Sequence, residues 1–299
     1  MFFFATSSKN LVDAENVTVS SEGKNHRPVI YTFFQSSESL NCLPASDCPE
    51  NESGNLLLSL WKEEWSYAGW NPVVLTLKDA EKHADYEKLK AELDSLRLDT
   101  FGNLTFSRWI AMAAVGGGWY ADYDAFPIRQ FPSDLPNNGR MTVYDTASPT
   151  LASGSAEEWL LTVNALLGDA KNHQSTDPQS LTFWTDSLGV LSLMRTYGNK
   201  KSPSPQTSRR VANPYGRKDP ILTDSGCDTK PFRGRWVVHF GLEMVQGAQF
   251  VPPELRLPKH RVKLAKHWLS KWKEKCNAQQ ATAENLLQND MTSASPYIN

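Results

Sequence analysis

Residues 108–124 read RWIAMAAVGGGWYADYD and carry the clearest fold signal of this 299-residue chain. The apolar run Leu104–Val115 predicts a helix, and Gly116–Gly118 is expected to end it with a tight turn. The residues that follow, Trp119–Phe126, are rich in aromatic side chains and predict a strand. The stretch therefore predicts a helix, a glycine turn and a strand in direct succession.

The predicted strand carries two aspartates near its end. Because alternate side chains of a strand share a face, Tyr120, Asp122 and Asp124 are expected to point the same way, with the aspartate Cα atoms roughly 6–7 Å apart. Paired carboxylates suit Mg²⁺ or Mn²⁺, and open α/β sheets bind ligands at the carboxyl ends of their strands. A D-x-D triplet also occurs about once per chain by chance, so a solvated strand end is the plain alternative.

Strands and helices alternate along much of the chain. Strands are expected at 28–34, 72–77 and 235–240, and helices at 56–67, 156–167 and 181–197, with one helix or a pair of helices at 78–96. This alternation predicts an α/β sandwich around a mainly parallel sheet. Lys200–Lys218 is rich in Ser, Pro and Arg and is expected to be a mobile loop.

The prediction divides the chain into three parts. Residues 1–26 are polar and aperiodic and form a disordered lead, residues 27–258 form the α/β domain, and residues 259–299 form a C-terminal amphipathic helix and tail. The helix is expected over Lys259–Leu287, with an apolar stripe of Val262, Ala265, Trp268, Leu269, Trp272 and Cys276. Its other face is lysine-rich, which indicates either a solvated surface or peripheral contact with an anionic membrane.

Composition and charge exclude several classes of protein. The 31 Lys and Arg against 33 Asp and Glu give a net charge of -2, so nucleic-acid binding through a global basic field is not expected. No stretch reaches the roughly 18 apolar residues of a membrane span, and no signal-peptide core is recognisable, which indicates a cytosolic protein unless a targeting segment is missing. Cys42 and Cys48 share a loop and are either a local disulfide or free thiols.

The motif around the two aspartates resembles the sugar-nucleotide-binding region of the DXD glycosyltransferases. These are relatives of initiation-type α-1,6-mannosyltransferases and α-1,4-N-acetylglucosaminyltransferases and, more distantly, of the glucosylating clostridial toxins. Their pattern is a helical Arg, about seven residues, Gly-Gly, an aromatic residue and Tyr-x-Asp-x-Asp. It is matched in register over about twenty residues by Arg108, Gly117-Gly118, Trp119, Tyr120, Asp122 and Asp124.

The resemblance implies a role for each matched residue. Asp124 is expected to bind a divalent metal, usually Mn²⁺, while Asp122 contacts the ribose and the metal shell. Arg108 is expected to contact the donor sugar or phosphate, and Tyr120 to stack on a sugar face. The family often has an Asp three residues before the Arg, where this chain has the neutral Thr105.

Four further positions resemble the family less closely. Thr32 and Gln35 end a strand that would hold the nucleotide, but ordinary strand-end polarity also explains them. Asn164 would lie near the donor sugar, or it is a helix residue without a functional role. His239 would bind the metal or the diphosphate, or it is a satisfied core histidine.

The expected protein is a GT-A-like, Rossmann-type sandwich with a C-terminal helical region. It would act as a hexosyltransferase that moves a sugar from a nucleotide-sugar donor to a hydroxyl acceptor on a glycan, glycoprotein or glycolipid. The family resemblance implies retention of configuration, a requirement for Mn²⁺ or Mg²⁺, and work in the Golgi or secretory lumen. Two alternatives stay open: a non-catalytic sugar-binding relative, favoured by Thr105, and a glycoside hydrolase, which also needs two carboxylates.

Overall fold

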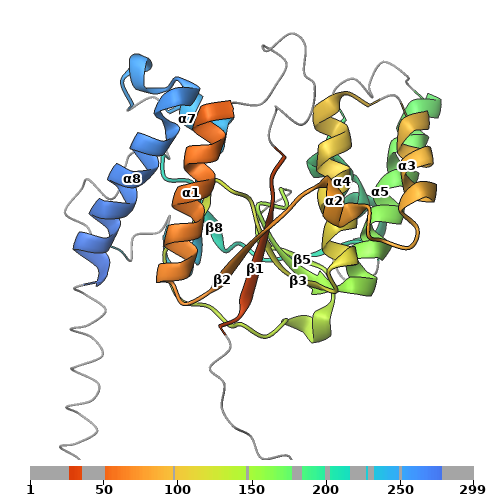
Figure 1. The fold of residues 1–299 in the computed structure, drawn as a ribbon, viewed down its shortest axis with the longest axis horizontal. Helices are drawn as coiled ribbons and strands as arrows, with labels where there is room; N and C mark the ends of the chain where they lie inside the picture. Colours follow the sequence, from red (N-terminus) through yellow and green to blue (C-terminus); the bar gives the residue numbers. More distant parts are fainter. Residues whose placement is uncertain are drawn as a thin grey trace, which may run out of the picture.

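The structure is a computed structural model that describes residues 27–35, 51–96, 98–145, 148–176, 184–198, 203–215, 227, 232–248 and 251–277. A six-stranded sheet runs through its middle (Figure 1). The strand order is β2 (Asn71–Leu75), β1 (Val29–Phe33), β3 (Gly117–Ala121), β6 (Leu151–Ser155), β5 (Thr142–Val143) and β7 (Gln206–Thr207).

Three of the five pairings in this sheet are parallel, and only β6 runs against its two neighbours. The predicted α/β class with a mainly parallel central sheet is therefore confirmed, and the order agrees with a GT-A-like sandwich. Strand β6 was not predicted because its sequence, Leu-Ala-Ser-Gly-Ser, contains no β-branched or aromatic residue.

Helices cover both faces of the six-stranded sheet (Figure 1). One face carries α2 (Leu77–Ala80), α3 (Tyr86–Ser95), α4 (Thr100–Ala114), α5 (Ala156–Thr176) and α6 (Asp186–Tyr197). The other face carries α1 (Asn51–Tyr67) and α8 (Arg261–Trp272). Each face of the sheet covers a hydrophobic core, and the side chains of β1 alternate between the two. Ile30 lies in the core beneath α1 and α8, and Phe33 lies in the core on the other face.

A second sheet of three short strands lies beside the first, in the order β4 (Ala125–Pro127), β9 (Val237–His239) and β8 (Val211–Ala212). The prediction of one strand over Trp119–Phe126 is wrong, because β3 ends at Ala121 and β4 joins the second sheet. Between them the chain turns, and the Ala125 amide donates to the Asp122 carbonyl at 2.9 Å. The aspartates therefore lie in a turn that connects two sheets.

The segment Lys200–Lys218 contains both β7 and β8, so its prediction as a loop is wrong at these residues. Each strand has two residues, which is too short to show a hydrophobic pattern. Each is held by a partner distant in sequence, β5 for β7 and β9 for β8. Non-local pairing of this kind leaves no local signal.

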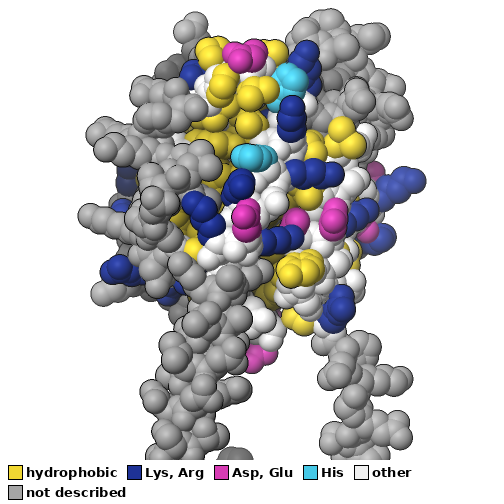
Figure 2. Space-filling model, turned by 90° about the vertical axis from the view of Figure 1, so that its left-hand side faces the viewer, with side chains coloured by type: hydrophobic (Ala, Val, Ile, Leu, Met, Phe, Trp, Pro, Cys, Tyr) yellow, Lys and Arg dark blue, Asp and Glu magenta, His cyan; other side chains and the backbone are white. Residues whose placement is uncertain are grey.

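Helix α8 packs against α1 through the predicted apolar stripe, all six residues of which are buried. A 3-10 turn, Pro258–His260, precedes the helix, and a π-helical turn, Lys273–Asn277, follows it. The expected end at Leu287 lies outside the described residues, as does the expected lead 1–26. Lys263, Lys266 and His267 are exposed. Basic and acidic side chains mix on the side of the molecule where α8 lies (Figure 2).

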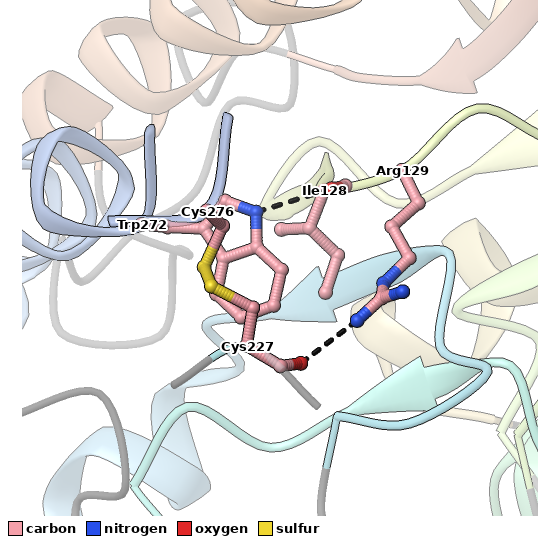
Figure 3. The surroundings of a disulfide bond; sticks show 5 residues. All are labelled: Ile128, Arg129, Cys227, Trp272 and Cys276. Carbon is pink, nitrogen blue, oxygen red and sulfur yellow. Dashed lines mark hydrogen bonds between the residues drawn. A yellow bond between two sulfur atoms is a disulfide. The ribbon is translucent and has the colours of Figure 1, made fainter. Parts of the chain in front are cut away.

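A disulfide joins Cys227 to Cys276, with 5.5 Å between the Cα atoms (Figure 3). Beside it the Trp272 indole donates to the Ile128 carbonyl at 3.1 Å, and Arg129 donates to the Cys227 carbonyl at 2.7 Å. The bond ties the end of the α8 region to a segment 49 residues earlier. The local pair considered from the sequence, Cys42 and Cys48, lies outside the described residues.

Candidate metal centre

The glycines after α4 set where the two aspartates emerge from the sheet. Gly116, Gly117 and Gly118 all have positive φ. A Cβ on Gly117 would lie 2.5–2.6 Å from backbone atoms of residues 154–156, so only glycine lets β3 lie this close to β6. Strand β3 then ends at the carboxyl edge of the sheet, the edge at which open α/β sheets bind ligands.

Asp122 is held by two donors on its Oδ1 atom. The Arg108 Nη1 atom donates to it at 2.9 Å and the Tyr120 hydroxyl at 2.7 Å. Burial raises the pKa of Asp122 above its ordinary value; Arg108 opposes this shift and the charge of Asp124 adds to it. The three side chains therefore form one hydrogen-bonded unit.

Arg108 is also bound to Asp186, the first residue of α6. Its Nε atom donates to the Asp186 Oδ2 atom at 2.9 Å, and a second guanidinium nitrogen donates to the same oxygen. The Trp109 indole donates to that oxygen too, at 2.7 Å. Burial alone would lower the pKa of Arg108, but Asp186, Tyr120 and Asp122 hold it well above its ordinary value.

Asp186 was not predicted as a site residue. Its carboxylate is almost completely buried, because its side chain is 2% exposed. The available signal was an acidic residue at the first position of a helix, directly after the capping residue Thr185. That position alone indicates a solvated helix start, so the partner Arg108, 78 residues earlier, could not be inferred.

Asp124 is held by residues from the C-terminal part of the chain. Its Oδ1 atom lies 3.1 Å from the His239 Nε2 atom, and its Oδ2 atom accepts a hydrogen bond from Arg261. Burial would raise the pKa of Asp124, but His239 and Arg261 outweigh burial and hold it well below its ordinary value. Burial likewise opposes the charged form of His239, yet Asp124 raises the pKa of its imidazole.

Arg261 and Gly241 complete this half of the centre, and neither was predicted. Arg261 is 2% exposed and donates twice to the Phe240 carbonyl, from Nε at 3.2 Å and Nη2 at 3.0 Å. In the sequence it stands near the start of the expected amphipathic helix, outside its apolar stripe and 137 residues from Asp124. A Cβ on Gly241 would lie 2.7 Å from the His239 Cε1 atom, so the ring lies where any larger residue would displace it.

Asp122, Asp124 and His239 each offer a ligand atom, and these atoms lie within 4.8 Å of one another. Two carboxylates and one imidazole form a donor set of the kind that binds divalent cations. The residues therefore fit a divalent cation. The expectation that strand alternation aligns the aspartates is wrong; a turn and the packing of β9 against β4 bring them to the histidine.

The other predicted residues have different surroundings. Thr32 is fully buried at the end of β1, and its hydroxyl has no hydrogen-bond partner. The Gln35 Oε1 atom accepts from the Leu77 amide at 3.2 Å. Thr105 donates to the Gly102 carbonyl at 2.8 Å, and the exposed Asn164 donates to the Leu160 carbonyl at 3.0 Å, so both are bonded within their own helices.

Comparison with known proteins identifies a family and a structural neighbour. A solved structure titled "crystal structure of a glycosyltransferase involved in the glycosylation of the major capsid of PBCV-1" is 10% identical, with a TM-score of 0.37, over 78% of this chain and 98% of that chain. No curated protein matches the chain. Within the part that the structure describes, no helix combines the length and apolar character needed to cross a membrane. Residues 7–174, more than half of the sequence, match the family model Domain of unknown function (DUF8765), and the chain belongs to that family.

Proposed function

We propose that the protein is a metal-dependent hexosyltransferase that moves a sugar from a nucleotide-sugar donor to a hydroxyl acceptor with retention. The observation that carries this proposal is the convergence of Asp122, Asp124 and His239 within 4.8 Å at the carboxyl edge of the sheet. The resemblance of residues 108–124 to the DXD motif supports a nucleotide sugar as the ligand.

Asp124 and His239 would hold the cation, with Asp122 beside them. When bound, Mn²⁺ or Mg²⁺ supplies positive charge that stabilises the diphosphate leaving group. In the transfer, the bond from sugar C1 to the diphosphate oxygen breaks and a bond from C1 to the acceptor oxygen forms. The acceptor proton passes to the departing diphosphate.

Arg108 would act on the donor while it orients Asp122. Its guanidinium is bound to Asp186 and Asp122, and its side chain is still 13% exposed. This arrangement fixes a positive charge beside the aspartates without the entropy cost of ordering a free arginine. Arg108 is therefore assigned both the positioning of Asp122 and a charge contact with the donor.

Thr32 supports a nucleotide site at the end of β1. A buried hydroxyl without a partner costs about 1–3 kcal/mol, which a hydrogen bond to a bound ligand would recover. Because Thr32 is fully buried, this contact would require the ligand to reach beneath the surface at the end of β1, and it stays a prediction. Gln35 lies three residues later at the same edge and would border the same ligand.

A non-catalytic sugar-binding protein is the second candidate, and one observation favours it. Thr105 stands at the position of a donor-binding carboxylate in the resembled family, and its hydroxyl is bonded within its own helix. Such a protein would bind the donor without turnover. A glycoside hydrolase is not favoured, because its carboxylates flank the scissile bond from separate elements, whereas Asp122 and Asp124 share one turn.

The proposed compartment is the Golgi or secretory lumen, as the resemblance implies. The Cys227–Cys276 disulfide supports this proposal, because disulfides persist in oxidising compartments and are rare in the cytosol. The acceptor would then be a glycan, a glycoprotein or a glycolipid. Peripheral contact of the α8 face with an anionic membrane stays a prediction.

The test is release of UDP or GDP from a panel of nucleotide sugars, with Mn²⁺ and with EDTA. The wild type should hydrolyse one donor slowly in a metal-dependent way. Asp124→Asn should reduce the rate by about a hundredfold, because it removes the carboxylate that binds the cation. Asp134→Asn is the matched control, since Asp134 is exposed on a loop.

Equal rates for Asp124→Asn and Asp134→Asn, or a rate that EDTA does not change, would contradict the proposal. Metal-dependent donor binding without release, tested also with an acceptor mixture, would establish the binding-protein alternative instead.

A further inference from the structure

Three segments meet beside β5 and bring three arginines together. The Arg210 amide donates to the Tyr144 carbonyl at 2.8 Å, and the Trp236 amide donates to the Arg210 carbonyl at 2.8 Å. The Arg210 side chain also donates from Nη1 to the Gly234 carbonyl at 3.0 Å. The arginine cluster is our name for Arg209, Arg210 and Arg235, which lie on the segments that these bonds join.

The charge of Arg209 and Arg210 is not balanced by an ion pair within the part of the chain that the structure describes. Arg209 is exposed, and neither it nor Arg210 has a carboxylate within ion-pair distance among the described residues. The Arg210 guanidinium lies 4.8 Å from the centre of the Trp236 ring, and its Nε atom is buried without a hydrogen-bond partner. Burial and the charges of Arg209 and Arg210 lower the pKa of Arg235, as expected for cations held close together.

The arginine cluster lies at the same edge of the sheet as the candidate metal centre. Strands β3 and β5 both run against β6, and β7 runs with β5, so all three end at this edge. Asp145 follows β5, two strand spacings or about 10 Å from the end of β3. The charge of Asp145 acts on both Arg235 and His239, so the cluster and the centre share a charged neighbour.

We propose that the arginine cluster binds a phosphate ester carried by the acceptor. Arginine binds phosphate through its planar, bidentate donor fork, and the contact with the Trp236 ring restrains the Arg210 guanidinium. The role given to this ligand rests on the proposed function, in which the donor diphosphate is bound at the aspartates. The phosphate ester of the acceptor would then bind at the arginine cluster, a second anion site at the same edge of the sheet. A soluble sugar phosphate and a phospholipid headgroup share this chemistry.

The binding test uses the full chain and inorganic pyrophosphate in EDTA, so that no cation bound at the aspartates contributes. The variant Arg209→Gln/Arg210→Gln should bind pyrophosphate at least about tenfold more weakly, because it loses charge-assisted hydrogen bonds. The matched control is Lys263→Gln/Lys266→Gln, which removes two exposed cations from α8 and should bind like the wild type. Equal weakening in both double variants, or none in the arginine variant, would overturn the inference.

A second arm separates the two sources of the phosphate ester. Glycerol phosphate in solution and phosphatidylcholine vesicles with and without phosphatidylinositol are offered to the same variants. Arginine-dependent binding of glycerol phosphate alone indicates a soluble acceptor, and arginine-dependent flotation with the phosphatidylinositol vesicles indicates a lipid-linked one. Either result supports the site, and binding of neither probe overturns it.

Mn²⁺-dependent UDP binding separates this inference from the proposed function. The arginine variant should keep that binding at the wild-type level, whereas Asp124→Asn should lose it. Wild-type protein that binds pyrophosphate through the arginines but never binds UDP with Mn²⁺ would keep the anion site and remove its role in glycosyl transfer. Loss of UDP binding in the arginine variant would overturn the inference, because the arginines would then belong to the donor site.

Discussion

Asp122 and Asp124 are two residues apart, yet they are neutralised by different regions of the molecule. Asp122 is bound by Arg108, 14 residues away on α4, within the six-stranded sheet and its helices. Asp124 is bound by Arg261, 137 residues away on α8, which belongs to the layer around the second sheet. The turn between β3 and β4 is thus where two regions meet, and each supplies the counterion of one aspartate.

The two regions contribute different residues to the candidate metal centre. The family match over residues 7–174 includes Arg108 and both aspartates but ends before His239 and Arg261. The first region therefore provides the carboxylates, and the second provides the imidazole and the charge that holds Asp124. A working centre would need both regions to be folded and packed together.

Replacing Arg261 gives the largest effect expected on the second half of the centre. Arg261→Met leaves the buried Asp124 carboxylate with only His239, and breaking a buried ion pair in this way costs about 3–5 kcal/mol. Urea unfolding measures the loss. The double variant Asp124→Asn/Arg261→Met should recover part of it, because the uncompensated charge is gone.

Lys263→Met, an exposed change on the same helix, is the control and should alter the free energy of unfolding by less than about 0.5 kcal/mol. A loss below about 1 kcal/mol for Arg261→Met would mean that His239 alone neutralises Asp124. Arg261 would then not play the role for Asp124 that Arg108 plays for Asp122.

Removing the disulfide should destabilise the second region more than the first. Cys227→Ala/Cys276→Ala opens a loop of 49 residues, and the loss of a native disulfide of this span typically costs about 2–4 kcal/mol. Because the bond ties down the end of the α8 region, hydrogen exchange should rise first in α8 and later, if at all, in α4. An equal rise in both helices would contradict the division into two regions.

The sequence predicted the longer elements of both regions and missed the short ones. The helix before the glycines, the strand β1, the helix α1 and the helix α8 each have a run of apolar or aromatic residues long enough to be recognised, and β9 lies inside the strand expected at 235–240. The strands β4 and β8 have three and two residues and exist only through their pairing with β9. Propensity has nothing to act on over such lengths.

The candidate centre shows the same limit. Arg108, Tyr120 and Asp122 lie within 15 residues and are joined by direct hydrogen bonds, as a local motif allows one to expect. His239 was identified only through resemblance; the structure places it 3.1 Å from Asp124, and its metal-binding role stays a prediction. Arg261 and Asp186 were missed because an isolated charged residue at a helix start looks the same whether it faces solvent or a distant partner.

The smallest effect is expected in the first region, at the capping box of α2. The Asp79 Oδ2 atom accepts from the Thr76 amide at 2.9 Å and from its hydroxyl at 3.0 Å, directly after β2. Asp79→Asn should cost about 0.5–1 kcal/mol, because the helix has four residues and an amide accepts more weakly than a carboxylate. Asp94→Asn, an exposed change on α3, is the control.

The effect of Asp79→Asn should depend on pH. Burial would raise the pKa of Asp79, but Lys82 and Thr76 lower it below its ordinary value of 3.8. The stabilisation is therefore complete above the ordinary pKa and is lost as the pH falls through the lowered one, so wild type and variant should converge in acid. Because this contact is local, its loss should leave α8 exchange and pyrophosphate binding unchanged. A change in either would show that the two regions are coupled through more than the turn at Asp122 and Asp124.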